Sequence, residues 1–374
     1  MLPAQLTRPA VTWPGPQWLA LFYDLAFAAG IIALSGSYGY DYSGLGALWF
    51  AITYGILASV WLLTGGATGG FTTDQRTITT GIVVLVAVQM TGVLMLALAS
   101  GDSIAASSGV FDVCLALLLA TVLGLAGLAR GSSHSVPFRA LIGVAVAMVT
   151  LGLAWVLPEP FDLLVWILAL AILGLAAASV ALDARVDLRR LAHRLGELTI
   201  IIIGEILVKV TLTLGEESLW SVRIWALVPL LVFLVAVWWA YFTGPIHVVA
   251  VAGSRRVVWI TAHWGLHVAL LGLAVGLGKL LVGAETLAKP AATTALLTAP
   301  VLLMVASLAV LDWITDGPRH VSLAIAAVVV AVVTVTAAIT EVPPGITAYT
   351  LAAITLAAVA VPLARRRVRP LESR

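Results

Sequence analysis

The chain has 374 residues, of which 61% are hydrophobic and only 10% are charged, and its formal net charge is +2. A soluble domain carries about 25% charged residues, so this composition excludes an ordinary soluble protein and predicts one embedded in a bilayer. The single cysteine, Cys114, excludes a disulfide within the chain, and no basic stripe with interleaved aromatic residues indicates nucleic-acid binding.

Apolar segments of a length that can span a bilayer follow one another along the chain, since a helix needs roughly 20 apolar residues to cross the hydrocarbon core. They are 18–35, 44–64, 77–99, 110–129, 140–157, 161–182, 196–214, 222–242, 257–282, 291–311, 321–340 and 346–364. We therefore predict an all-α, polytopic transmembrane bundle of about 12 spans. It would occupy residues 18–364, between a cytoplasmic segment, 1–17, and a basic cytoplasmic tail, 365–374. No internal repeat is evident, which neither supports nor excludes an inverted-repeat transporter.

The distribution of arginine predicts the orientation, because cytoplasmic loops of membrane proteins carry an excess of Lys and Arg. With the N-terminus inside, the outside loops hold only Arg223 and Lys289. The inside segments hold Arg8, Arg76, Arg130, Arg139, Arg185, Arg189, Arg190, Arg194, Arg255, Arg256, Arg319, Arg365, Arg366, Arg367, Arg369 and Arg374. Dropping one span would swap the sides of every later loop, so the bias supports the span count and places both termini in the cytoplasm.

Five ionisable residues lie well inside the predicted spans, where each costs roughly 2.5–3.5 kcal/mol on insertion scales. Glu205 and Lys209 are spaced i,i+4, which fits either a structural ion pair or a carboxylate that handles a proton or a substrate. Asp24 has only apolar neighbours one turn away, so we expect a partner on another helix or a cavity. His263 and His267 share a helix face but lack further metal ligands. We therefore expect neutral histidines hydrogen-bonded between helices, and no metal or cofactor.

Several of these residues fall in strings that resemble the bacterial low-temperature-requirement A (LtrA) family. Leu21–Phe27 resembles its "LFFDLVFV" opening, and Arg194–Glu205 its "ERFGLFTIIVLGES" signature. Trp238–Phe242 is similar to "WWLYF", and His263–Leu266 followed by Ala274–Gly276 resembles "HLPLVAGIVALAVG". Gln89–Leu94 is also reminiscent of the family. The aromatic residues of 238–242 fit an interfacial belt or a pocket wall.

This resemblance implies a multi-pass protein of the bacterial inner (plasma) membrane and draws attention to Asp24, Glu205 and His263. The family name implies a growth phenotype, and no established reaction comes with it. The chain departs from the pattern at Ala20, His193, Glu197 and Ile206, and the acid-rich segment after the second span is reduced to 71–76, with Asp74 as its one acid. If that acidic cluster serves the family's activity, this chain has lost or changed it.

Three functions fit these observations. The first is a transporter-like protein for a small or lipophilic solute, with Asp24, Glu205, Lys209, His263 and His267 around a polar site. The second is a membrane-embedded enzyme, a lipid or isoprenoid cyclase or isomerase, in which Glu205 or Asp24 donates a proton to an olefin or epoxide. The third is a non-catalytic sensor or assembly protein, in which the polar residues only fix helix packing. The lipid bilayer is the one partner that the sequence predicts outright, and it leaves the oligomeric state open.

Overall fold

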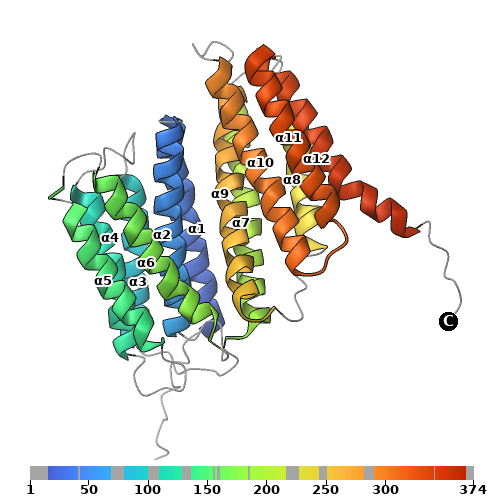
Figure 1. The fold of residues 1–374 in the computed structure, drawn as a ribbon. Helices are drawn as coiled ribbons and strands as arrows, with labels where there is room; N and C mark the ends of the chain where they lie inside the picture. Colours follow the sequence, from blue (N-terminus) through green and yellow to red (C-terminus); the bar gives the residue numbers. More distant parts are fainter. Residues whose placement is uncertain are drawn as a thin grey trace, which may run out of the picture.

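The computed structural model describes residues 16–40, 43–68, 80–99, 109–128, 136–154, 156–157, 161–183, 186–215, 227–243, 251–281, 290–340 and 342–367. Within these ranges the chain forms only α-helices, which confirms the predicted all-α bundle (Figure 1). They are α1 (Pro16–Tyr40), α2 (Gly44–Thr68), α3 (Thr80–Ala99), α4 (Gly109–Leu128), α5 (Phe138–Ala154), α6 (Phe161–Ala181), α7 (Leu188–Gly215), α8 (Leu227–Phe242), α9 (Ser254–Leu281), α10 (Pro290–Ile314), α11 (His320–Thr340) and α12 (Pro344–Arg367). Most of the predicted terminal segments, and Asp74 with the weakened acidic motif, lie outside the described residues.

The helices match the predicted spans one for one, but some extend beyond them. The largest difference is in α7, which begins at Leu188, whereas the apolar run begins at Gly196. The Asp187 carboxylate accepts a hydrogen bond from the backbone N–H of Arg189 (2.9 Å), so it caps the helix at its N-terminus. The first two turns of α7 are therefore helical although they are rich in arginine, and this extension places Arg194 inside the bundle.

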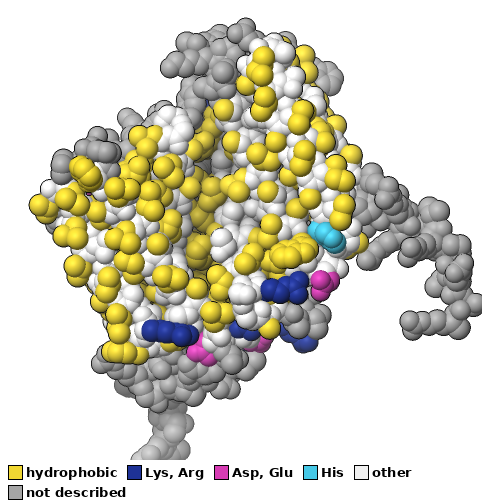
Figure 2. Space-filling view, viewed as in Figure 1, with side chains coloured by type: hydrophobic (Ala, Val, Ile, Leu, Met, Phe, Trp, Pro, Cys, Tyr) yellow, Lys and Arg dark blue, Asp and Glu magenta, His cyan; other side chains and the backbone are white. Residues whose placement is uncertain are grey.

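The outer surface of the bundle suits a lipid environment. Within the described ranges, eight helices are long and apolar enough to cross a membrane, namely α1, α2, α3, α4, α6, α9, α10 and α11. Helices α5, α8 and α12 contribute shorter apolar stretches. Figure 2 shows hydrophobic side chains over the wall of the molecule, while the Lys, Arg, Asp and Glu side chains seen in this view lie along its lower edge. The protein is thus a multi-pass helical membrane protein.

The arginines of the described part lie at one end of the bundle. Consecutive helices alternate in direction, so all odd-numbered helices begin at the same end (Figure 1). The first turns of α5, α7 and α9 carry arginine, as do the residue before α11 and the end of α12. The positive-inside rule assigns this end to the cytoplasm.

The bundle is built from two six-helix halves with the same packing scheme. Figure 1 shows α1–α6 on the left and α7–α12 on the right. In the first half α1 packs on α2 and α3, α3 on α4, α4 on α5, α5 on α6, and α2 on α6. In the second half α7 packs on α8 and α9, α9 on α10, α10 on α11, α11 on α12, and α8 on α12. Adding six to each helix number of the first half gives the helix pairs of the second half. Two contacts fall outside this scheme, that of α2 with α4 and that of α10 with α12.

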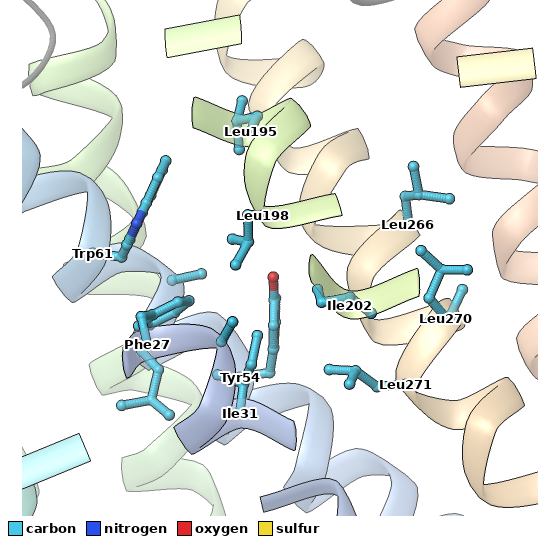
Figure 3. Packing of buried hydrophobic residues seen from close by; sticks show 14 of the residues in the cluster. Phe27, Ile31, Tyr54, Trp61, Leu195, Leu198, Ile202, Leu266, Leu270 and Leu271 are labelled. Atoms are coloured by element: carbon cyan, nitrogen blue, oxygen red, sulfur yellow. The ribbon is translucent and has the colours of Figure 1, made fainter. Parts of the chain in front are cut away.

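This arrangement is a repeat that the sequence did not reveal. Because each half contains six helices, both halves enter the bilayer from the same side and form a parallel repeat, as opposed to an inverted one. The halves meet where α1 packs on α7 and α9, and where α2 and α6 pack on α9. Figure 3 shows this junction, with Phe27 and Trp61 from the first half facing Leu198 and Ile202 of α7 and Leu270 of α9.

Within the second half, α9 and α10 approach closely because α9 presents glycine at the contact. A Cβ atom added at Gly276 would lie 2.7 Å from the backbone oxygen of Leu296 in α10. Small residues allow such backbone approach in membrane bundles. Two residues further on, a Cβ added at Gly278 would meet nothing within 4 Å. Glycine is therefore required by packing at the first position and not at the second.

Candidate functional site

A buried ion pair joins the two halves through α1 and α7. Arg194 donates from Nε to Asp24 Oδ2 (2.8 Å), and its terminal amino group donates to Asp24 Oδ1. Trp61 of α2 donates its indole N–H to the same Oδ1 (2.6 Å). Asp24 is fully buried and Arg194 is 5% exposed. The structure thus confirms the expectation that Asp24 has a partner on another helix.

The electrostatics of this group explain how two charges are tolerated inside the bundle. The Arg194 guanidinium lies 4.9 Å from the centre of the Trp61 ring, a cation–π distance. The Asp24 carboxylate accepts from three N–H donors, which matches its ionised form, and the two opposite charges cancel. The sequence predicts Arg194 in an inside segment before the seventh span, but the structure places it within α7 and buried, because α7 starts earlier than its apolar run.

His267 of α9 forms a second polar junction between the halves. Its Nδ1 lies 2.8 Å from the Tyr54 hydroxyl of α2, and its Nε2 lies 2.8 Å from the Thr199 hydroxyl of α7. Thr199 already donates its proton to the Leu195 carbonyl (2.7 Å), so it must accept from Nε2–H. Tyr54 then donates to Nδ1, and Figure 3 shows its hydroxyl pointing into the junction. His267 is thus a neutral imidazole hydrogen-bonded between helices, as expected.

His263, one turn before His267, is only half satisfied. Its Nδ1 lies 2.8 Å from the Trp259 carbonyl oxygen, so Nδ1 carries the proton and donates within the same helix. Its Nε2 is buried and has no hydrogen-bond partner among the described residues. The expectation of an interhelical hydrogen bond is therefore not met at His263, which instead packs edge to face against the ring of Tyr241 in α8.

Glu205 lies apart from this group. It is half-buried on α7, roughly 26 Å along the helix axis from Leu188 at 1.5 Å per residue. Within the described part of the chain it makes no hydrogen bond to Asp24, His263 or His267. Lys209 belongs to the same helix, but its side chain lies outside the described residues, so the predicted Glu205–Lys209 pair stays a prediction.

The aromatic string at the end of α8 divides between two environments. Trp238 and Trp239 are 49% and 38% exposed, which fits an interfacial belt. Tyr241 is fully buried and packs on His263, so it belongs to the interior. Both interpretations of the string are thus partly right, because successive residues of one helix face different sides.

Other residues of the polar group are not among the site candidates that the sequence suggests. Tyr54 and Thr199 lie in apolar runs and become significant only because their helices meet at His267. Gln89 of α3 is fully buried and accepts a hydrogen bond from Thr64 of α2 (2.9 Å). A glutamine in the middle of a span was the available signal, since such a side chain needs a partner in hydrocarbon.

A cavity of about 100 Å³ lies elsewhere, between α4, α5 and α6, with Asp112, Leu119, Met148 and Trp166 in its lining. It touches none of the five predicted site residues. Across the described ranges, no cluster of three or more His, Cys, Asp or Glu side chains could hold a metal ion.

The described polar groups therefore form a band across the interior. It runs from Gln89 and Thr64 through the Asp24–Arg194 pair and His267 to His263. Asp24 is occupied by three donors and is not free to protonate a substrate, which counts against it as the acid of a cyclase. Within this band, the Asp24–Arg194 pair and the contacts of His267 with Tyr54 and Thr199 join the two helical halves.

The family model for the bacterial low temperature requirement A protein (LtrA) matches residues 17–361. The chain belongs to the LtrA family. No curated protein and no solved structure matches it. The LtrA match runs from α1 to α12, so both six-helix halves are part of the family's common region.

The polar band of this LtrA protein draws on the strings that resemble the family. The first string supplies Asp24, the α7 string supplies Arg194 and Thr199, and the α9 string supplies His263 and His267. These strings are far apart in the sequence, and the structure brings them together at the junction of the two halves.

Proposed function

We propose that this LtrA-family protein is a transporter-like membrane protein that passes a small or lipophilic solute along the polar junction between its two six-helix halves. The observation that carries the proposal is the location of the polar contacts. The Asp24–Arg194 pair and the Tyr54–His267–Thr199 chain both connect one half to the other. Parallel repeats that meet around a central polar region are a recurrent transporter architecture, and alternating access arises when one repeat rocks against the other.

Each residue has a role in this proposal. Asp24, Arg194 and His267 act as joints whose bonds hold the halves together in the closed arrangement. Glu205, half-buried on α7 and outside the joints, is the carboxylate for a coupling proton, with Lys209 on the next turn. His263 faces the interior with a free acceptor and contributes to solute binding. Ionisable groups in the interior of a many-span bundle commonly mark such pathways.

Cross-linking the halves tests the proposal directly. A Cβ atom added at Gly39 of α1 would lie 3.5 Å from Val275 Cγ1 of α9, at the end opposite the arginines. Gly39→Cys with Val275→Cys, in a Cys114→Ala background, should therefore form a disulfide that locks the two halves together. The matched control is Gly265→Cys with Ser307→Cys, which links α9 to α10 within one half; a Cβ added at Gly265 would lie 3.9 Å from the Ser307 Cβ.

The assay uses proteoliposomes loaded with a pH-sensitive dye and a panel of lipophilic amines, alcohols and carboxylic acids. We expect solute-dependent flux that the inter-half disulfide stops and a reductant restores, while the disulfide within one half leaves it intact. Glu205→Gln should abolish the proton dependence of the flux. Absence of flux for every solute, together with a cellular effect that survives Glu205→Gln, would refute the proposal.

A further inference from the structure

A second group of polar atoms lies in the interior and takes no part in the hydrogen bonds that connect the two halves. The side chains of Tyr241, Trp259 and His263 are fully buried, and the Trp259 indole N–H and His263 Nε2 have no hydrogen-bond partner among the described residues. The Tyr241 hydroxyl makes no hydrogen bond of ordinary geometry, although it lies near the Thr199 side chain of α7. The three rings are in contact. The His263 ring centre lies 4.4 Å from that of Trp259 and 5.5 Å from that of Tyr241. Buried polar atoms without partners are rare, so a cluster of them points to a missing ligand.

The equivalent position in the first half is joined by a direct hydrogen bond between side chains. By the repeat, α2 and α3 correspond to α8 and α9. There Thr64 of α2 donates directly to Gln89 of α3 at 2.9 Å, which closes the contact between the helices. In the second half Tyr241 and His263 occupy the corresponding pair of helices but touch only through their rings. The second half therefore lacks the direct side-chain hydrogen bond that joins the corresponding helices of the first half, where the Gln89 amide nitrogen is nevertheless also without a partner among the described residues.

The chemistry of the three atoms defines the ligand group. His263 carries its proton on Nδ1, so Nε2 can only accept, and the ligand must donate to it. The Trp259 indole can only donate, so the ligand must also accept. The Tyr241 hydroxyl can do either. A single hydroxyl group satisfies both requirements, whereas an ether, an ester or a hydrocarbon does not.

The surroundings define the rest of the ligand. The walls are aromatic, with Phe242 packed edge to face on Tyr241 at 4.9 Å. Arg319 reaches the same end of α8, but its guanidinium donates to the Ala240 carbonyl (3.0 Å) and the Thr243 hydroxyl (2.8 Å). Because the three open groups are neutral, a charged ligand would be desolvated without a counter-charge. On the outer side of α8, the rings of Trp238 and Trp239 are exposed.

We infer that Tyr241, Trp259 and His263 form a binding site for the hydroxyl group of a neutral, lipophilic alcohol or phenol that enters from the bilayer. This inference rests on the proposed function in that it names the solute class, but the binding site can be tested without any transport measurement. The rival occupant is a lone water molecule, which offers the same donor and acceptor without an apolar body.

The test is a binding experiment on the full-length protein in lipid nanodiscs, with histidine labelled with ¹⁵N. The probes are the straight-chain alcohols from ethanol to octanol, 4-butylphenol, and its methyl ether, 4-butylanisole. We expect at least one alcohol or phenol to move the His263 Nε2 resonance upfield in a saturable way, as the nitrogen accepts a hydrogen bond. The methyl ether, which cannot donate, should leave the resonance in place. His263→Phe, which keeps an aromatic ring, should remove the signal and the binding.

A second variant separates binding from folding. Tyr241→Phe removes a hydroxyl that interacts with the Thr199 side chain of α7, so its thermal midpoint should stay close to that of the wild type, whereas affinity for the probe should fall roughly tenfold. The inference is overturned if no probe moves the resonance, if ether and phenol act alike, or if Nε2 is already hydrogen-bonded before any probe is added and stays so, which is the lone-water outcome. Binding of the probe without any flux would refute the proposed function and leave this inference intact. Flux that does not depend on the hydroxyl group would refute this inference and leave the proposed function intact.

Discussion

Replacing Asp24 with asparagine is the sharpest test of the junction between the halves. The substitution keeps the shape of the side chain but leaves the Arg194 guanidinium, 5% exposed, without its counter-charge. Removing one partner of a buried ion pair costs about 3–5 kcal/mol. Asparagine retains one acceptor oxygen for Trp61 or Arg194, so we expect a loss near the lower limit, about 3 kcal/mol.

The assay is reversible unfolding in mixed micelles, followed by steric trapping or by denaturation with sodium dodecyl sulfate. Asp24→Asn combined with Arg194→Gln should lose less than the sum of the two single variants, because each single variant leaves a partner stranded. Asp316→Asn is the matched control, since the Asp316 side chain is 88% exposed and lies 3.7 Å from Arg255; solvent screens that pair, and its loss should be near zero. If Asp24→Asn unfolds within about 1 kcal/mol of the wild type, the ion pair does not hold the halves together.

Three further predictions address other features of the fold. Tyr54→Phe removes the donor to His267 Nδ1 and should lower the free energy of unfolding by about 1 kcal/mol, measured in the same micelles; a neutral result would mean that this bond is absent. Gly276→Ala should destabilise by about 1–3 kcal/mol because the new methyl meets the α10 backbone, while Gly278→Ala should be neutral or slightly stabilising, and equal effects would contradict the close approach of α9 and α10. In a Cys114→Ala background, an impermeant maleimide added to intact cells should label a cysteine at Phe161 but not one at Arg189, and the opposite pattern would invert the topology.

The helices themselves were predictable from the sequence because two independent signals agree. Hydrocarbon demands long apolar helices, and arginine marks alternate connections. The boundary of α7 was not predictable from hydropathy, since a capped helix can continue through charged turns when one face is buried. Leu191 and Leu195, both fully buried, provide that face. Arg194 was therefore expected outside the helix, because the predicted seventh span begins at Gly196 and α7 begins at Leu188.

The site was predictable only in part, for a physical reason. A lone Asp24 in hydrocarbon requires a partner, so the need for one could be stated in advance. The identity of the partner depends on which helices meet, and apolar strings carry little information about that. The same limit hid the repeat of two halves, because similar packing is achieved with unrelated apolar residues. That Nε2 of His263 lacks a hydrogen-bond partner could not be predicted either, because the sequence does not show that Nδ1 bonds to the Trp259 carbonyl of the same helix.

The ion pair between α1 and α7 has a consequence for biogenesis. Asp24 leaves the ribosome 170 residues before Arg194, so several hairpins enter the translocon while the carboxylate has no counter-ion. Until the seventh helix is inserted, the first half supplies Asp24 with the Trp61 indole N–H of α2 as a hydrogen-bond donor but with no counter-charge from Arg194. Translation products truncated before α7 would carry Asp24 without its counter-ion, which makes this helix more costly to hold in hydrocarbon. The second half therefore supplies the counter-charge for an acid that the first half carries into the membrane.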